Sequence, residues 1–339
     1  MNSNERKLYY QQLIAEGKNI FIGSLADMGL TSSDLASIGE PHGLNVESVL
    51  ATADGIQGFV IKHQGHLIEV RRRVGDDVQH AFLHECIIRD HIKKIPSEPV
   101  HAMIPETLAM DWQAGFILSA HVETKPLIPL PFALYESFFQ SLWDLERSQL
   151  FATELSARTL GVTSTHVVMK DVAHLVPFDP LNDYNEQGLV FPASHMIERF
   201  EKQYLIEAWA ELETSDSVTA VIENIKIEKA AMLIIYMNKL RYLQTHGASV
   251  TILAWMNGLI DEIKKYLAGP DELWQEYMTN RYRGYVKDLV DELDQPAITP
   301  LTLRKLDFLI QYAQNEEAKD RYLKFKNEAL LKPIVEERI

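Results

Sequence analysis

Cysteine is almost absent from this sequence, because Cys86 is the only one among its 339 residues. A single cysteine excludes a disulfide framework within the chain, and it excludes a zinc site built from several cysteines. Cys86 lies in an apolar pattern of helical period. We therefore expect a buried structural thiol there and not a nucleophile.

Long apolar runs are also lacking. No stretch approaches the roughly 18 uninterrupted apolar residues that a membrane helix needs. Residues 1–18 are charged and contain no apolar signal-peptide segment. We therefore expect a cytoplasmic protein without a membrane partner, or one that acts in a host cytosol if it is a secreted effector.

Basic residues are in the minority. Lys and Arg number 33 against 48 Asp and Glu, which gives a net charge of −15. This balance disfavours nucleic acid and anionic membranes as the main partner, since both need clustered Lys and Arg. The only short basic candidates are Arg71–Arg73 and Lys93-Lys94, and such runs are usually solvated surface.

Two motifs of hydrolytic enzymes are missing. His84-Glu85 begins the zinc-protease pattern, but that pattern needs a second histidine at the position occupied by Ile88. The chain also has no G-x-S-x-G motif around a nucleophilic serine. The sequence therefore supports neither a metalloprotease nor a serine hydrolase.

The first third of the chain is rich in predicted strands. Apolar alternation predicts a three-strand antiparallel meander, with turns at Asp54-Gly55 and Gln64-Gly65. A helix over 78–95 follows, and then a second hairpin. The predicted strands cover 45–52, 57–63, 66–72, 107–110 and 115–121.

Prolines mark a boundary near residue 130, and the chain beyond it is predicted to be mostly helical. We divide the sequence into an N-terminal helical extension (1–39), a β-rich small lobe (40–125) and a helical large lobe (126–339). The boundary prolines are Pro126, Pro129 and Pro131. The predicted helices cover 5–17, 134–151, 194–213, 218–245, 249–268, 270–293 and 300–330, with an isolated strand over 167–172.

Asp171 is the strongest single candidate for a functional residue. It ends the apolar run Val167–Met169, and a carboxylate at the end of a buried strand must find a partner or a metal. His166 and His174 flank it, so a carboxylate–imidazole metal site is one alternative.

The segment Phe151–Pro180 resembles the catalytic loop and metal-binding segment of a divergent protein-kinase-like protein. The resemblance implies a two-lobed protein-kinase-like α+β fold, with a small antiparallel β lobe plus one helix, a large mostly helical lobe, and a hinge near residues 122–131. Glu154 falls where the family has its catalytic aspartate. Thr159 falls at the metal-ligating asparagine, and Asp171 falls at the metal-binding aspartate that ends a strand.

The resemblance also implies ATP and Mg²⁺ as cofactors, with departures from the family pattern. Glu154 reaches about one methylene further than aspartate, and misplacement is costly in a positioned site. The Thr159 hydroxyl is a weaker metal ligand than an amide oxygen. A G-x-G-x-x-G loop is absent.

A kinase-like site also needs a cation on a strand of the small lobe, held by a glutamate on the next helix. Glu85 is the candidate glutamate. Lys62 lies in a run that resembles the family's lysine element, and lysine is the usual phosphate partner. Arg71 and Arg72 lie on the strand directly before the helix, so topology favours them. The sequence leaves this choice open.

These residues predict a divergent kinase-like protein that binds ATP and Mg²⁺. It would transfer phosphate, or another nucleotide-derived group, to an unknown acceptor as an atypical phosphotransferase. The alternative is a pseudokinase scaffold, in which no chemistry occurs and the helical lobe binds a protein partner.

Overall fold

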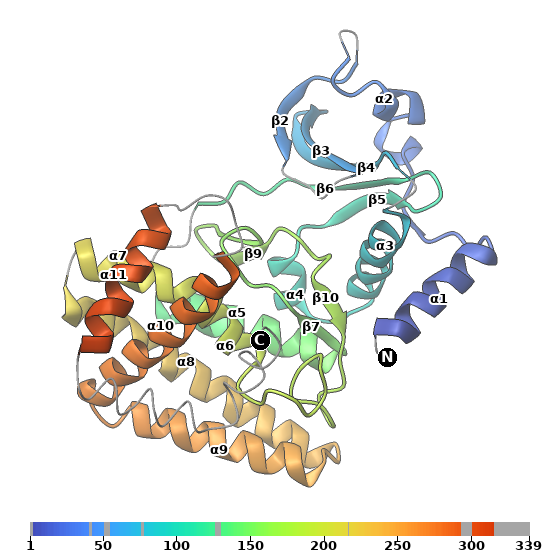
Figure 1. The fold of residues 1–339 in the computed structure, drawn as a ribbon. Helices are drawn as coiled ribbons and strands as arrows, with labels where there is room; N and C mark the ends of the chain where they lie inside the picture. The colour runs from blue at the N-terminus through green and yellow to red at the C-terminus, as the bar shows by residue number, and fades with distance from the viewer. Residues whose placement is uncertain are drawn as a thin grey trace.

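The structure, a computed structural model, describes residues 3–40, 43–50, 55–75, 78–125, 130–215, 217–292 and 300–314. It is of the α+β class. A six-stranded antiparallel sheet lies at one end of the molecule, and most of the helices lie at the other (Figure 1). We call these the sheet half and the helical half.

The sheet contains all five predicted strands and one that was not predicted. Its strand order is β1-β5-β6-β4-β3-β2. The unpredicted strand, β1, is only two residues long and pairs with β5 at the edge. The bounds are β1 Phe21–Ile22, β2 Val46–Leu50, β3 Ile56–His63, β4 His66–Arg73, β5 Thr107–Asp111 and β6 Phe116–Ala120.

The hairpin between β3 and β4 turns at the predicted dipeptide. Gln64 and Gly65 both have positive φ, at 49° and 85°. Two successive residues with positive φ make the tight turn that suits the twist of paired strands. The hairpin sets the register of β4, in which Arg71 lies opposite Gly58 and Leu67 lies opposite Lys62.

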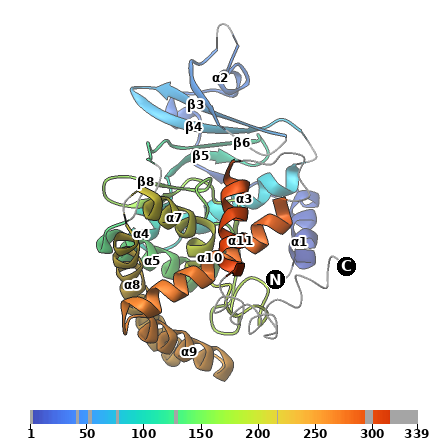
Figure 2. The same ribbon diagram turned by 60° about the vertical axis from the view of Figure 1, so that its left-hand side comes forward.

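Helices cover both faces of the sheet. The short helix α2 (Ser32–Ala36) begins at Thr31, whose side chain accepts a hydrogen bond from the backbone of Asp34. It packs on one face, where Ile68, Val70 and Leu118 are buried. Helices α1 (Ser3–Ala15) and α3 (Gln79–Lys93) pack on the other (Figure 2).

The helix α3 belongs to two cores. Phe82, Leu83 and Cys86 pack with α1 and the sheet, which confirms Cys86 as a buried thiol. Ile88 and Ile92 pack instead into the large core of the helical half. The two halves are therefore joined by shared apolar packing through this helix.

The helical half agrees with most of the predicted helices. The helix α4 was not predicted, and α5 ends earlier than predicted because β7 begins at Leu150. The segment predicted as one helix over 194–213 contains a π-helical turn, η2. The bounds are α4 Glu98–Met103, α5 Phe132–Arg147, α6 Met196–Phe200, η2 Glu201–Leu205, α7 Ile206–Ser215, α8 Val218–Thr245, α9 Val250–Tyr266, α10 Pro270–Glu292 and α11 Pro300–Gln314.

Four short strands sit between α5 and α6. They are β7 (Leu150–Ala152), β8 (Leu160–Val162), β9 (Val167–Met169) and β10 (Leu175–Pro177). The prediction that the strand over 167–172 is isolated was wrong, because β9 pairs with β8 and β7 pairs with β10. These strands hold the two loops that carry Glu154 and Asp171.

The segment after β6 runs alongside β8. Lys125 forms a bridge with Val162, and a side chain at Gly161 would collide with Thr124, which lies 2.4 Å from the position of its Cβ. Several predicted features lie outside the described residues. These are Ala51, Thr52, Asp54, Pro126, Pro129, residue 293 at the end of one predicted helix, and the segment 315–330.

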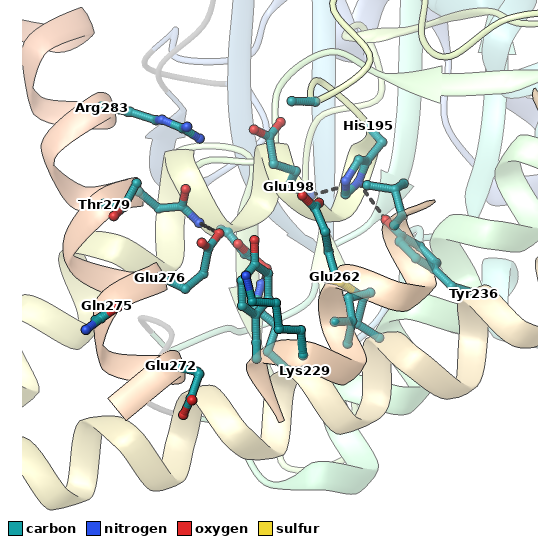
Figure 3. A pocket seen from close by; sticks show the side chains of 18 residues that line it. His195, Glu198, Lys229, Tyr236, Glu262, Glu272, Gln275, Glu276, Thr279 and Arg283 are labelled. Atoms are coloured by element: carbon teal, nitrogen blue, oxygen red, sulfur yellow. Dashed lines mark hydrogen bonds and ion pairs between the residues drawn. The ribbon is translucent and has the colours of Figure 1, made fainter. Parts of the chain in front are cut away.

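Among the described residues, no helix is long and apolar enough to cross a membrane. A cavity of about 530 Å³ lies within the helical half, between α6, η2, α8, α9 and α10 (Figure 3). It is separate from the predicted site residues.

Candidate functional site

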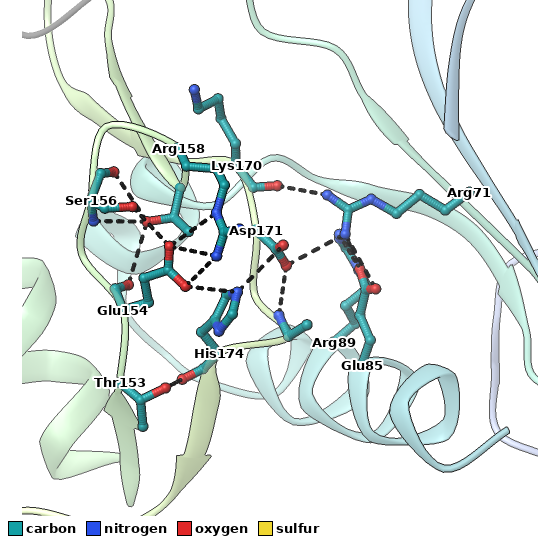
Figure 4. A network of polar contacts seen from close by, with 12 residues as sticks. Arg71, Glu85, Arg89, Thr153, Glu154, Ser156, Arg158, Lys170, Asp171 and His174 are labelled. Atoms are coloured by element: carbon teal, nitrogen blue, oxygen red, sulfur yellow. Dashed lines mark hydrogen bonds and ion pairs between the residues drawn. The ribbon is translucent and has the colours of Figure 1, made fainter. Parts of the chain in front are cut away.

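Arg71 is the centre of a polar network between the two halves (Figure 4). Its side chain leaves β4 toward α3, where Nη1 donates to both carboxylate oxygens of Glu85 at 3.1 and 3.3 Å. The same nitrogen lies 3.5 Å from Asp171 Oδ1, and Nη2 donates to the carbonyl oxygen of Lys170 at 3.0 Å. The guanidinium of Arg71 thus joins β4 to Glu85 in α3 and to Asp171 after β9, the elements in which the sequence predicts site residues.

Asp171 follows β9 at the start of a tight turn. Its Oδ1 accepts from the backbone N–H of Ala173 at 2.9 Å, which fixes the carboxylate next to the strand end. Its Oδ2 lies 3.8 Å from His174 Nε2. About a third of the Asp171 side chain stays exposed, so it is the most accessible carboxylate on Arg71.

Glu154 lies on the loop after β7 and is held from several sides. Arg158 donates to both of its oxygens, at 2.9 and 2.8 Å, and the Ser156 hydroxyl donates to Oε1 at 2.8 Å. His174 Nε2 lies 3.2 Å from Oε2. His174 therefore connects Glu154 to Asp171.

Thr159 is buried in its own loop. Its hydroxyl accepts from the backbone N–H of Ser156 at 3.1 Å and lies 3.2 Å from the carbonyl oxygen of the same residue. Only 1 % of Thr159 is exposed. Its contacts are those of a residue that shapes the loop, because its hydroxyl is engaged by backbone groups of Ser156 and Glu154.

The strand register separates the three candidate cations. Arg72 points to the opposite face of β4, where it donates to the carbonyl oxygens of Leu35 and Ala36 at 2.8 Å each. Lys62 is exposed at the turn end of β3, four residues from the partner of Arg71, or about 13 Å along the strand. Of the three, only Arg71 reaches Glu85.

Opposite charges keep the carboxylates of the network ionised. Burial would raise the pKa of Glu85, but the guanidinium groups of Arg71 and Arg89 outweigh burial and lower this pKa below its usual value. Burial likewise opposes ionisation of Asp171, and Arg71 together with the Ala173 N–H lowers the pKa of its carboxyl. Burial also acts against Glu154, whose pKa is lowered by the hydrogen bonds from Arg158 and Ser156.

Three residues of the network were not among the predicted site residues. Arg89 follows Glu85 by four positions in α3 and donates from Nε at 2.9 Å. Arg158 follows Glu154 by four positions. The spacing i, i+4 is a signal that the sequence carries for the Arg89 pair, because such residues meet on one helix face. His174 was considered only as a metal ligand.

The described residues form no preassembled site for a resident metal ion. Among the described residues, no group of three or more His, Cys, Asp or Glu side chains is placed to hold a metal ion. His166 does not join Asp171, since its Nδ1 lies 2.9 Å from the hydroxyl of its neighbour Thr165. Mg²⁺ in nucleotide sites is bound by one or two carboxylates and by the phosphates themselves. Asp171 alone meets that requirement.

The network has balanced charge when His174 is neutral, with Arg71, Arg89 and Arg158 against Glu85, Asp171 and Glu154. A phosphate group that approaches Arg71 would replace Asp171 or the Lys170 carbonyl as its partner.

No protein-family model matches this chain, and no curated protein matches it.

Proposed function

We propose that the chain is a divergent protein-kinase-like protein that binds a nucleoside triphosphate at Arg71, where the two halves meet. The observation that carries this proposal is the Arg71–Glu85 ion pair with Asp171 on the same guanidinium. A cation on a sheet strand, a glutamate on the following helix and an aspartate after a strand of the helical half correspond to the set that protein kinases use for phosphoryl transfer.

In this proposal each residue has a defined role. Arg71 contacts the phosphates, and Glu85 holds its guanidinium in place from the buried side. Asp171 binds the Mg²⁺ that arrives with the nucleotide. Arginine suits a phosphate partner because its planar fork matches phosphate oxygens in a bidentate way. The Lys62 alternative receives no support, because this residue is exposed away from Glu85.

Transfer to an acceptor would depend on Glu154. Its lowered pKa supports an ionised carboxylate at neutral pH, which is the state that accepts a proton from a hydroxyl. Arg158 and His174 occupy its oxygens, however, so an acceptor hydroxyl must displace one of them. Arg158 is the easier to displace, since three quarters of its side chain is exposed.

A second candidate is the pseudokinase scaffold, which binds a protein partner through the helical half without chemistry. The burial of Thr159 favours it, because the hydroxyl at the second metal-ligand position of the family pattern is already bonded to the backbone of its own loop. The two candidates differ in whether phosphate is transferred and in whether the helical half binds a protein partner.

A thermal-shift titration with ATP and MgCl₂ tests whether the protein binds nucleotide at Arg71. Saturating nucleotide at about a hundred times its dissociation constant should stabilise the protein by about 2.7 kcal/mol. Asp171→Asn and Arg71→Met should remove this shift, whereas Lys62→Met should keep it. Circular dichroism checks that each variant is folded. No shift at about 5 mM nucleotide, or an equal shift in Asp171→Asn, would overturn the proposal.

Autophosphorylation then separates the two candidates. Phosphate incorporation that is lost in Glu154→Gln supports the phosphotransferase. Incorporation that is absent from the wild type, in a protein that still shows the thermal shift, supports the scaffold.

A further inference from the structure

The cavity of the helical half shares no residue with the Arg71 network. Its wall comes from α6, η2, α8, α9 and α10, so helices far apart in the sequence enclose one space (Figure 3). Its volume of about 530 Å³ falls in the range of small-molecule pockets. The π-helical turn η2 forms part of the wall, and such turns occur frequently at functional sites.

Carboxylates are in excess in this wall. Five glutamates line the cavity. Two of them are paired with lysines, as Glu201 is with Lys229. The other three are Glu262, Glu272 and Glu276, and the cations Lys265 and Arg283 line the same wall.

Glu276 and Glu262 lie close enough to affect one another. Glu276 accepts a hydrogen bond from the amide of Asn280 at 2.8 Å, and its side chain points into the space between the helices (Figure 3). Partial burial and the negative charge of Glu276 raise the pKa of Glu262, and they outweigh Arg283, Lys265 and Lys229, which lower it. A cation placed between the two carboxylates would relieve this repulsion.

His195 provides a second and independent feature of the cavity. Its Nδ1 accepts from the backbone N–H of Glu198 at 3.2 Å and lies 2.6 Å from the hydroxyl of Tyr236. A ring nitrogen that accepts a backbone N–H carries the lone pair, so the proton of the neutral ring is on Nε2. Burial, reinforced by Lys239 and Lys229, lowers the pKa of His195 and keeps the ring neutral.

The Nε2–H of His195 has no hydrogen-bond partner among the described residues, although only 5 % of the residue is exposed. The hydroxyl of Thr279, in the opposite wall and 6 % exposed, also makes no hydrogen bond with the described chain. Neither atom is among the fully buried unpaired polar atoms of the described residues, so both are accessible from the cavity. A donor and a hydroxyl left free on a cavity wall point to a ligand with an oxygen acceptor.

We propose that this cavity binds a small organic molecule that carries a primary ammonium group and an oxygen acceptor, such as an amino alcohol. The ammonium group lies between Glu262 and Glu276, and the acceptor takes the hydrogen bond from His195 Nε2. The proposal does not depend on nucleotide binding at the Arg71 network, because the two sites have no residue in common.

Isothermal titration of the full chain with three probes that share a six-carbon chain tests the proposal. The probes are 6-amino-1-hexanol with both groups, hexylamine with the ammonium group alone, and 1-hexanol with the hydroxyl alone, at matched ionic strength. The amino alcohol should bind saturably below about 10 mM, and hexylamine should bind more weakly. Absence of saturable binding by the amino alcohol, or equal binding by 1-hexanol, overturns the proposal.

Variants locate the two contacts. Glu276→Gln should weaken binding of the amino alcohol by about tenfold, since a charged hydrogen bond is lost. His195→Phe should abolish the preference for the amino alcohol over hexylamine. Glu211→Gln makes the same charge change at an exposed site of α7 and should bind as the wild type does. Unchanged affinity for the amino alcohol in folded Glu276→Gln would refute the ammonium site. The thermal shift of this variant with ATP should remain as in the wild type.

Discussion

At the scale of single residues, the environment of Arg71 follows from the pleat of β4. Side chains of a strand alternate between its two faces, so Arg71 faces α3 while its neighbour Arg72 faces α2. Arg71 is nearly buried, and its Nε has no hydrogen-bond partner in the described part of the chain. A buried guanidinium in this position depends strongly on the carboxylate of Glu85.

Glu85→Gln should lower the free energy of unfolding by about 3–5 kcal/mol. The substitution keeps the shape of the side chain but leaves the charges of Arg71 and Arg89 without their buried partner. Urea denaturation measures the change. Glu98→Gln, at an exposed position of α4, is the control and should cost about 0.5 kcal/mol or less. Equal decreases in the free energy of unfolding in the two variants would show that the buried ion pair does not stabilise the fold more than an exposed charge does.

Asp171 should contribute stability that depends on pH in the acid range. Its pKa in the folded protein lies below the usual value, so the unfolded chain takes up the proton first as the pH falls. The contribution is complete above about pH 5 and is lost as the pH falls through about 4 and below. The difference in unfolding free energy between the wild type and Asp171→Asn should therefore shrink between about pH 5 and pH 3.

The comparison with Asp171→Asn is needed because other carboxyls act in the opposite direction. Burial raises the pKa values of Glu146 and Glu228, so their protonation favours the folded state as the pH falls. These effects are the same in both proteins and cancel in the difference. A difference that stays constant across this range would contradict the lowered pKa of Asp171.

Part of the candidate site was accessible to sequence reasoning. The strand-end position identified Asp171, and the helix after the strands identified Glu85. The choice among Lys62, Arg71 and Arg72 was not accessible, because it depends on the register of β3 on β4 and on which face meets α3. The contacts of Glu154 and Thr159 depend on a loop with no periodic pattern, so only the structure reveals them.

At the scale of elements, α1 is attached to α3 through a hydrogen-bonded histidine. His84 Nε2 lies 2.8 Å from the carbonyl oxygen of Leu175 in β10 and must carry the proton there. Its Nδ1 then accepts from the Tyr10 hydroxyl at 2.5 Å. Three elements that are distant in the sequence thus meet at one ring, next to Glu85.

Tyr10→Phe should lower the free energy of unfolding by about 1–2 kcal/mol, because it removes the hydroxyl donor from the mostly buried His84 ring. Amide hydrogen exchange of α1 should also become faster. Tyr9→Phe removes a hydroxyl from a neighbouring exposed ring and should change neither quantity. If α1 exchanges equally fast in both variants, the hydrogen bond to His84 does not hold this helix.

Elements with a long periodic pattern were predicted well, and short ones were not. The strands β3 and β4 and the helices α8 and α10 begin and end within one residue of the predicted bounds. The strands β7, β8 and β10 have three residues each, which is too short for alternation to be recognised. The helix α4 was missed because Pro99 indicated a break, whereas proline is compatible with the first turn of a helix.

At the scale of the whole molecule, the two halves are joined by both polar and apolar contacts. Arg71 reaches Asp171 across the junction, and His91 Nε2 lies 2.8 Å from the carbonyl oxygen of Ser148. Ile88 and Ile92 of α3 are buried in the core of the helical half. The order of the longer strands and helices was predictable from the sequence, but this shared core was not, since the same periodicity fits a helix that packs only on its own sheet.

The shared core should make the two halves unfold together. Ile260 is buried in α9, far along the chain from the sheet, and Ile260→Ala should cost about 2–5 kcal/mol. In a coupled molecule, hydrogen exchange under mild denaturant should show the same loss for peptides of β3 and β4 as for peptides of α8. Adding Ile92→Ala weakens the contact of α3 with the helical half, so the sheet peptides should then respond less to Ile260→Ala. If Ile260→Ala in the otherwise wild-type chain leaves the hydrogen exchange of the sheet peptides unchanged, the two halves unfold independently.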